Sequence, residues 1–457
     1  MIRKRLIPAL AIGGLLAMAA PSASAVASTY VSTGAIFNNP KGPQAEQNAI
    51  LGHVGRLING ALPGSTIKIS MYAFGSSWTA DRLVEAHHRG VNVQVLVDDD
   101  TISEAWMGQS GRTVRDKLVS AFAETPPSGT TYGTSWFRVC EYNKPCLADS
   151  SIGGVNHNKF FLFSRTTGSG SPTTGVPVDD VVVQSSGNLT GQDLSSLWND
   201  AMTVVDNQAL YAGYTAYFDR LTRAQADKSR VKDYSADVEA GVAKAYFFPR
   251  ASTDVVVNIL NTVGTGVDGV APTGGTYPGC SGNSAGHGTA DGRTVIRIAN
   301  GQISRPAVAQ KLWEMADDGC YIDVVYGKLA DYAAEGAHRE TAYWLTRSTR
   351  LGKISLHRLD NQGLSGPATT DGTAPDTGSS SHTKYMVIDG SYRAKKDQRI
   401  VFTGSHTFTG MALTDNDETL LKYEDKSADA GVFNAYVANF RAQRAEAAAE
   451  AEYGGVW

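Results

Sequence analysis

HNKFFLF at residues 157–163 and HTKYMVID at residues 382–389 are two copies of one pattern, and this repeated pattern decides the fold. In each copy a histidine and a lysine stand two residues apart at the start of an apolar run, which predicts a buried strand. Alternate side chains of a strand share a face, so an imidazole and an ammonium group should project together from each strand. One His-x-Lys triplet would be a weak signal, but two at matching positions of a repeat indicate a duplicated site.

The sequence around the two copies repeats as well. Residues 66–98 predict a strand, a helix that stops at Gly90 and a second strand, and residues 294–326 predict the same unit with Gly319 at the equivalent place. In both halves a His-x-Lys strand follows, then a strand ending in a Ser/Gly/Thr turn, then a short acidic strand. The expected fold is α/β, with two tandem similar lobes, each a mixed β-sheet flanked by helices, and the active site at the lobe interface.

The repeat also sets the expected boundaries. We expect an N-terminal lobe at residues 28–235 and a C-terminal lobe at residues 244–457. Residues 207–243 have a helical pattern that should join the lobes, and residues 432–451 should be its counterpart. Two stretches rich in Gly, Ser, Thr and Pro, at 165–178 and 360–381, are either surface insertions or rims of the substrate opening.

Residues 1–25 have the layout of a secretory signal peptide. Arg3, Lys4 and Arg5 precede an apolar run that closes with the small residues Ala23, Ser24 and Ala25. That run is shorter than the ~20 residues needed to cross a bilayer, so we expect a secreted, extracellular protein without stable membrane insertion.

The four cysteines allow three disulfide connectivities. Export makes disulfides chemically permitted. We favour Cys140 with Cys146 and Cys280 with Cys320, because each pair then lies within one half of the chain.

The composition argues against a protein dedicated to nucleic acid. The formal net charge is −4, and no dense Lys/Arg run occurs. Nucleic-acid binders usually carry a basic surplus or a basic stripe. A local basic cleft is nevertheless compatible with an acidic total.

The duplicated triplets supply what phosphodiester cleavage without a metal requires. Such a catalyst needs a neutral imidazole as nucleophile, a protonated imidazole as acid for the leaving group, and cations for the phosphoryl oxygens. We interpret His157 as the nucleophile and His382 as the acid, with Lys159 and Lys384 holding the oxygens. No metal and no other cofactor is expected.

The pair HNKFFLF and HTKYMVID resembles the duplicated HxKxxxxD signature of the phospholipase D superfamily, most closely its secreted actinobacterial members. The resemblance covers both halves and implies two α/β lobes with the site between them, a phosphohistidine intermediate and no metal. It implies that Asn188 is a catalytic polar residue, and that Glu418, with Asp200 as a second candidate, orients a histidine. The residues implied to contact substrate are Ser186, Ser405, Thr407 and Asp389.

This sequence departs from the family pattern at three places. Ser164 stands where the first motif expects the aspartate that the second keeps as Asp389. Thr407, beside His406, stands where the second half expects asparagine, and the first half offers Ala201 at the position of Glu418. These departures leave open which histidine attacks and which substrate is cleaved.

Three functions follow from the sequence. The first is a secreted phospholipase D that hydrolyses the head-group phosphodiester of glycerophospholipids at a membrane interface, with transfer to alcohols as a further expected reaction. The second is an extracellular nuclease or general phosphodiesterase of the same superfamily, with nucleic acid as a partner only in that case. The third is a binding protein whose site is catalytically silenced. A monomer is expected in each case.

Overall fold

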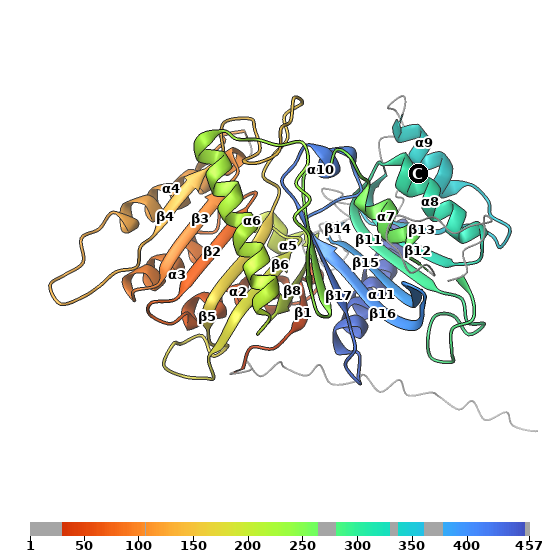
Figure 1. Ribbon diagram of the computed structural model, residues 1–457, viewed down its shortest axis with the longest axis horizontal. Helices are drawn as coiled ribbons and strands as arrows, with labels where there is room; N and C mark the ends of the chain where they lie inside the picture. The colour runs from red at the N-terminus through yellow and green to blue at the C-terminus, as the bar shows by residue number, and fades with distance from the viewer. Residues whose placement is uncertain (1–29, 106, 264–279, 330–336, 361–377, 453–457) are drawn as a thin grey trace, which may run out of the picture.

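In the computed structural model of the protein, the described residues are 30–105, 107–263, 280–329, 337–360 and 378–452. The predicted signal peptide lies outside them. Figure 1 shows two sheets side by side, each flanked by helices, and this confirms the predicted α/β fold. No helix within these ranges is long and apolar enough to cross a membrane.

The first sheet has seven strands in the order β1-β8-β6-β5-β2-β3-β4. The predicted β-α-β unit is confirmed, because β2 and β3 pair in parallel and α3 connects them. Helices α2, α3 and α4 form one layer, and α6 contacts β2, β5 and β6. The elements of this half are β1 (Gly34–Phe37), α1 (Gln44–Gln47), α2 (Ala49–Gly60), β2 (Thr66–Met71), α3 (Ser77–His88), β3 (Asn92–Val97), η1 (Asp99–Thr101), α4 (Gly108–Phe122), β4 (Trp136–Val139), β5 (Lys159–Thr166), β6 (Val178–Ser185), α5 (Gly191–Ser195), β7 (Leu197–Trp198), β8 (Asp200–Val204) and α6 (Gln208–Asp227).

The second sheet has eight strands in the order β13-β12-β11-β15-β16-β17-β10-β9. It repeats the same unit, with β11 and β12 paired in parallel and α8 between them. Its elements are β9 (Val238–Ala240), β10 (Ala243–Phe247), α7 (Val255–Asn261), β11 (Val295–Ile303), α8 (Pro306–Asp317), β12 (Tyr321–Leu329), α9 (Ala337–Thr346), β13 (Ser355–Arg358), β14 (Ser380–Ser381), β15 (Lys384–Tyr392), β16 (Lys395–Gly404), α10 (Gly410–Thr414), β17 (Thr419–Glu424) and α11 (Gly431–Glu452). The sheet therefore begins ahead of the lobe boundary predicted at residue 244.

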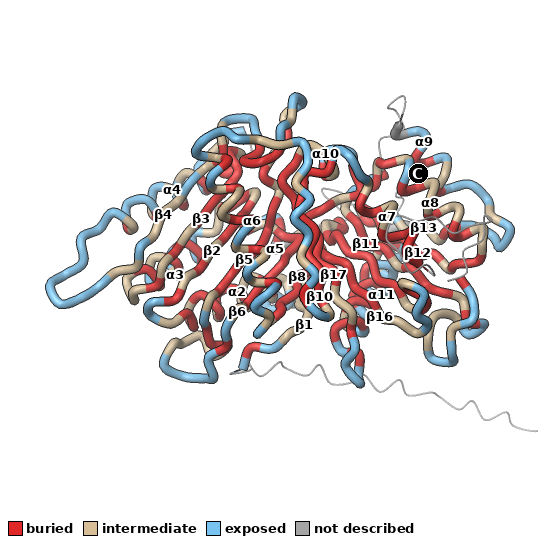
Figure 2. The backbone as a smooth tube through the Cα atoms, viewed as in Figure 1, coloured by how far each residue is buried: buried red, intermediate tan, exposed pale blue. Residues whose placement is uncertain are grey.

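The apolar runs of the two motifs are explained by burial on both faces of their strands. In β5, Phe160 and Leu162 enter the central core, whereas Phe161 and Phe163 enter the core beneath α2 and α3. In β15, Tyr385 and Val387 enter the same central core, and its alternate residues enter the core of the C-terminal half. Figure 2 shows the centre of both sheets largely as buried.

The two halves share that central core. Helix α6 contacts β6 of the first sheet and β10 of the second, and α11 contacts β1 of the first sheet and β11 of the second. The helices predicted in 207–243 and 432–451 are thus present, and each spans the junction. Parallel pairing of β7 with β14 adds a direct backbone link between the halves.

Of the two irregular stretches, only the first can be placed fully. It connects β5 to β6 at the end of β5 remote from His157, where Thr167 N donates to Gly60 O. Seven steps of strand separate Lys159 from Thr166, or roughly 23 Å. This stretch is a surface connection, so its interpretation as a rim of the substrate opening is wrong. Residues 361–377 of the second stretch lie outside the described residues.

Candidate active site

The two His-x-Lys triplets lie at equivalent places, leading into β5 in one sheet and β15 in the other. The amide of His157 donates to Asp417 O at 2.9 Å, and the amide of His382 donates to Trp198 O at 3.0 Å. Each histidine is thus held by a residue that precedes a strand of the opposite half. The site exists only where the two halves meet.

His157 is oriented by a buried carboxylate. Its Nδ1 lies 2.9 Å from Oε1 of Glu418, which is fully buried and also accepts hydrogen bonds from the Ser405 hydroxyl and from Asn416 Nδ2. In its ionised form Glu418 accepts and the imidazole N–H donates, so Nδ1 then carries the proton. The other ring nitrogen, Nε2, is left with its lone pair, as a nucleophile requires.

His382 is oriented differently. Its Nδ1 lies 2.9 Å from Oδ1 of Asn199, which also accepts from the Ser186 hydroxyl. A carboxylate is nearby, because Oδ1 of Asp193 lies 3.4 Å from the same ring nitrogen. The direct partner of His382 is therefore a neutral amide, with a carboxylate beside it.

Backbone hydrogen bonds show which residues of the two halves are equivalent. Ser186 N donates to Asp200 O at 2.9 Å, and Ser405 N donates in the same way, at 3.0 Å, to the residue that follows Glu418. The counterpart of Glu418 is consequently Asn199. The sequence alignment that placed Ala201 there was wrong by two residues.

Asp200 does not orient a histidine, which corrects the expectation drawn from the family resemblance. Its carboxylate accepts hydrogen bonds from the hydroxyls of Thr403 and Tyr436, both from the other half of the chain. Asp200 is fully buried, and its side chain joins the two halves behind the site.

Lys159 and Lys384 are almost completely buried, with 0% and 2% of their surface exposed. Each ammonium group donates to the carbonyl of the histidine two residues before it. Burial lowers the pKa of Lys159 to about 7 and that of Lys384 to about 8. An anionic ligand beside the two ammonium groups would favour their charged forms.

The histidines remain reachable, with 16% and 25% of their side chains exposed for His157 and His382. Burial, followed by the positive charge of the lysines, holds the pKa of both imidazoles well below its usual value. Burial raises the pKa of Glu418 to about 8. The resting site thus favours a neutral His157.

The turn residues support this arrangement more than they face a substrate. The hydroxyls of Ser186 and Ser405 are engaged with Asn199 and Glu418, and both serines are fully buried. We therefore replace their predicted role in substrate contact by a role in orienting the histidine partners.

Asn188 and Thr407 occupy equivalent turn positions and remain partly exposed. The Asn188 amide group donates to Asp193, and the Thr407 hydroxyl shares a hydrogen bond with Thr409. The predicted catalytic role of Asn188 and the predicted substrate contact of Thr407 stay predictions. Asp389 lies five residues along β15 from Lys384, roughly 16 Å away, where it pairs with His287. Its predicted contact with substrate is therefore wrong.

Sequence reasoning missed Asn199, Asp193 and Asp417. The first two could not be found because Asn199 is not acidic and Asp193 lies outside the short acidic strand.

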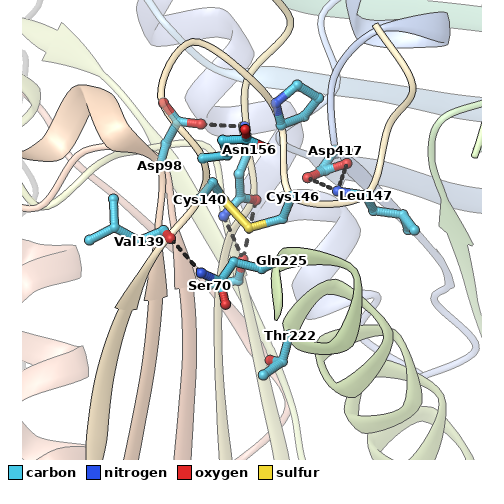
Figure 3. The surroundings of a disulfide bond; sticks show 12 residues. Ser70, Asp98, Val139, Cys140, Cys146, Leu147, Asn156, Thr222, Gln225 and Asp417 are labelled. Carbon is cyan, nitrogen blue, oxygen red and sulfur yellow. Dashed lines mark hydrogen bonds between the residues drawn. A yellow bond between two sulfur atoms is a disulfide. The ribbon is translucent and has the colours of Figure 1, made fainter. Parts of the chain in front are cut away.

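Both predicted disulfides form. Figure 3 shows that the loop after Cys146 meets Asp417, whose carboxylate accepts from the amides of Leu147 and Ala148. Within the described ranges, no group of three or more His, Cys, Asp or Glu side chains is placed to hold a metal ion.

Comparison with known protein families gives a match in each half of the chain. The model described as "Cardiolipin synthase, PLD-like domain" matches residues 55–222 and 290–442, and so covers both His-x-Lys strands and most of both sheets. The chain belongs to this phospholipase D-like family. Its function is of the phosphodiesterase type, and its two regions have the phospholipase D fold. Curated protein sequences gave no match.

The synthase described first below shares the fold, and two further solved structures are similar to parts of the chain or of their own length. Phosphatidylserine synthase from Haemophilus influenzae has a TM-score of 0.52 and 12% identity, over 90% of this phospholipase D-like chain and 85% of the synthase. Polyphosphate kinase from Porphyromonas gingivalis has a TM-score of 0.47 and 10% identity, and the match covers 90% of this chain but only half (50%) of the kinase. Nuc from Salmonella typhimurium has a TM-score of 0.29 and 16% identity, over 42% of this chain and 94% of Nuc.

Proposed function

We propose that this protein is a secreted, metal-independent phospholipase D that cleaves the head-group phosphodiester of glycerophospholipids. The observation that carries the proposal is that two histidines, each fixed through Nδ1 by a residue of the opposite half, lie close enough to two buried lysines for the charges of Lys159 and Lys384 to act on both rings. That set provides a nucleophile, an acid and an oxyanion site for one phosphodiester.

In the first step, Nε2 of His157 attacks phosphorus, and the bond from phosphorus to the head-group oxygen breaks. His382 gives its Nε2 proton to the leaving oxygen, so the head-group alcohol departs neutral. Lys159 and Lys384 hold the non-bridging oxygens. Binding of the anionic phosphate offsets the lysine charges that depress the pKa of His382, and so favours its protonated form.

In the second step, His382, now neutral, takes a proton from water. The oxygen of that water attacks phosphorus, and the bond from phosphorus to His157 breaks. The products are phosphatidate and the original enzyme. An alcohol in place of water would give a new phosphodiester, which accounts for transfer by the same residues.

Three observations support the lipid substrate and the extracellular location. The matching family model is described as a cardiolipin synthase domain, and cardiolipin is a phospholipid. The net charge of −4 disfavours a polyanionic substrate such as DNA. Two disulfides are typical of an oxidising compartment and fit the signal-like residues 1–25.

The test is to incubate the mature protein in EDTA with phosphatidylcholine vesicles and, separately, with DNA and bis(p-nitrophenyl) phosphate. We expect release of choline and formation of phosphatidate, both abolished in His157→Ala and His382→Ala. Cleavage of DNA without release of choline would replace the phospholipase by a nuclease. Absence of cleavage of all three substrates would indicate a binding protein with an inactive site.

A further inference from the structure

The two halves of the site each contain one carboxylate, but at different positions. In the C-terminal half the carboxylate is Glu418, on the strand position that contacts the histidine directly. In the N-terminal half that position is Asn199, and the buried carboxylate is Asp193 on the short helix α5. Each histidine thus has one carboxyl group within 3.4 Å of its Nδ1, from a strand position in one half and from a short helix in the other.

The equivalence of the two short helices identifies what stands at the position of Asp193 in the other half. The Thr190 hydroxyl accepts from Asp193 N at 3.2 Å, and the Thr409 hydroxyl accepts from Ala412 N at 3.2 Å. Ala412 is therefore the counterpart of Asp193. Because α10 forms with alanine there, the turn itself does not require a carboxylate.

Asp193 is held in one orientation by donors. Only 4% of the residue is exposed, and Oδ1 accepts from Asn188 N at 2.9 Å and from Asn199 Nδ2 at 3.4 Å, while Oδ2 accepts from the Thr190 hydroxyl. This leaves Oδ1 3.4 Å from Nδ1 of His382. Its negative charge also acts on Lys384, whose pKa it raises against the effect of burial.

We propose that Asp193 is a positioning residue that has taken over, for His382, the part that Glu418 plays for His157. This inference rests on the proposed function. Asp193 and the Asn199 amide together hold the Nδ1 proton of His382, and the carboxylate stabilises the imidazolium that donates from Nε2 to the leaving oxygen. The two histidines are then unequal, because only His157 has a carboxylate in direct contact with its ring.

A leaving-group comparison separates this role from a structural one. Phosphatidylcholine and phosphatidyl-p-nitrophenol share their lipid part, but only the alkoxide of choline needs a strong acid for departure. In Asp193→Asn we expect kcat to fall by about 10²-fold on phosphatidylcholine and by less than about fivefold on phosphatidyl-p-nitrophenol. A merely structural carboxylate would lower both rates equally, and that result would overturn the proposal.

Moving the carboxylate from position 193 to position 199 should restore activity, and this variant is the matched control. The double variant Asp193→Asn, Asn199→Asp places the carboxylate on the strand, where Glu418 has it in the other half. We expect its rate on phosphatidylcholine to return to within about tenfold of the wild type. Failure to recover, with the thermal unfolding midpoint unchanged, would contradict the proposal.

The outcome for the wild type distinguishes this inference from the proposed function. If the wild type cleaves neither lipid, the phospholipase proposal fails, and the same comparison is made between bis(p-nitrophenyl) phosphate and single-stranded DNA. A selective loss on DNA in Asp193→Asn would still support the positioning role. Equal losses, or inactivity on every substrate, would reject it.

Discussion

Glu418 in its ionised form is the partner that should matter most to the nucleophile, because only the carboxylate accepts the Nδ1 proton of His157. It contacts His157 Nδ1 at 2.9 Å and is fully buried, so no water can replace it without rearrangement. We expect Glu418→Gln to lower kcat by about 10²–10⁴-fold on both choline and p-nitrophenol esters, because formation of the phosphohistidine slows whatever group leaves. Steady-state rates on the two esters check this. A loss confined to the choline ester would assign Glu418 to the acid instead.

The buried lysines predict a fall in activity with rising pH. The pKa of Lys159 is lowered to about 7 and that of Lys384 to about 8, so their charges are present below these values and are lost as the pH rises through them. We expect kcat/KM for bis(p-nitrophenyl) phosphate to decrease between about pH 7 and pH 9. This substrate has little need of an acid. Glu418, whose pKa is raised to about 8, ionises over the same interval, and its carboxylate form would raise the rate by leaving Nε2 of His157 free, so a decrease reports the lysines. A rate that rises over this interval would contradict the prediction, because ionisation of Glu418 would then outweigh the loss of the lysine charges.

At the scale of single residues, the sequence was sufficient to predict that the duplicated histidines and lysines occupy equivalent places and that Glu418 contacts a histidine. These stand in registered copies of one pattern, and repetition makes a pattern visible. Asn199 and Asp193 were not predictable, because the carboxylate of the first half lies on a different element from that of the second. Their contacts with His382 depend on the register of the strands, which the amino-acid sequence alone does not reveal.

Among the elements, the loop closed by Cys140 and Cys146 should affect catalysis as well as stability. It presents the amides of Leu147 and Ala148 to Asp417, whose carbonyl holds the His157 amide. We expect Cys140→Ser, Cys146→Ser to lower the free energy of unfolding by about 2 kcal/mol. We also expect kcat to fall by about tenfold or more, as for the loss of other groups that support a site.

The second disulfide is the control for the first. Cys280 and Cys320 close a longer loop, 40 residues apart, at the start of β12 and remote from the histidines. Their replacement by serine should lower the free energy of unfolding by more, about 4 kcal/mol, and should leave kcat at 25 °C unchanged. Denaturant unfolding and initial rates measure the two effects. Equal rates for both double variants would contradict the role given to the first loop.

Elements with strong periodicity were predictable from sequence, including both β-α-β units and the helices that became α6 and α11. Gly90 and Gly319 follow α3 and α8 with φ of 89° and 113°, conformations that glycine adopts without strain. The irregular stretch after β5 was harder to interpret. Its composition is typical of a loop, but composition does not reveal at which end of a strand the loop lies.

For the whole molecule, each active site should be complete within one chain. His157 is held by Asp417 and His382 by Trp198 of the same chain, and α6 and α11 bury the junction between the halves. We expect a mixture of His157→Ala and His382→Ala chains to remain inactive on bis(p-nitrophenyl) phosphate. Exchange of halves between chains would instead restore about a quarter of the sites, as random pairing of swapped protomers requires.

Trapping the covalent intermediate is the most direct test of the chemistry proposed for this site. The protein is mixed with bis(p-nitrophenyl) phosphate, quenched in alkali within milliseconds and digested, and the peptides that contain His157 and His382 are examined by mass spectrometry. We predict a p-nitrophenylphosphoryl group on His157, with more of it in His382→Ala if hydrolysis slows more than attack. The same group on His382 alone would reverse the two roles, and its absence from both histidines during turnover would contradict a phosphohistidine mechanism.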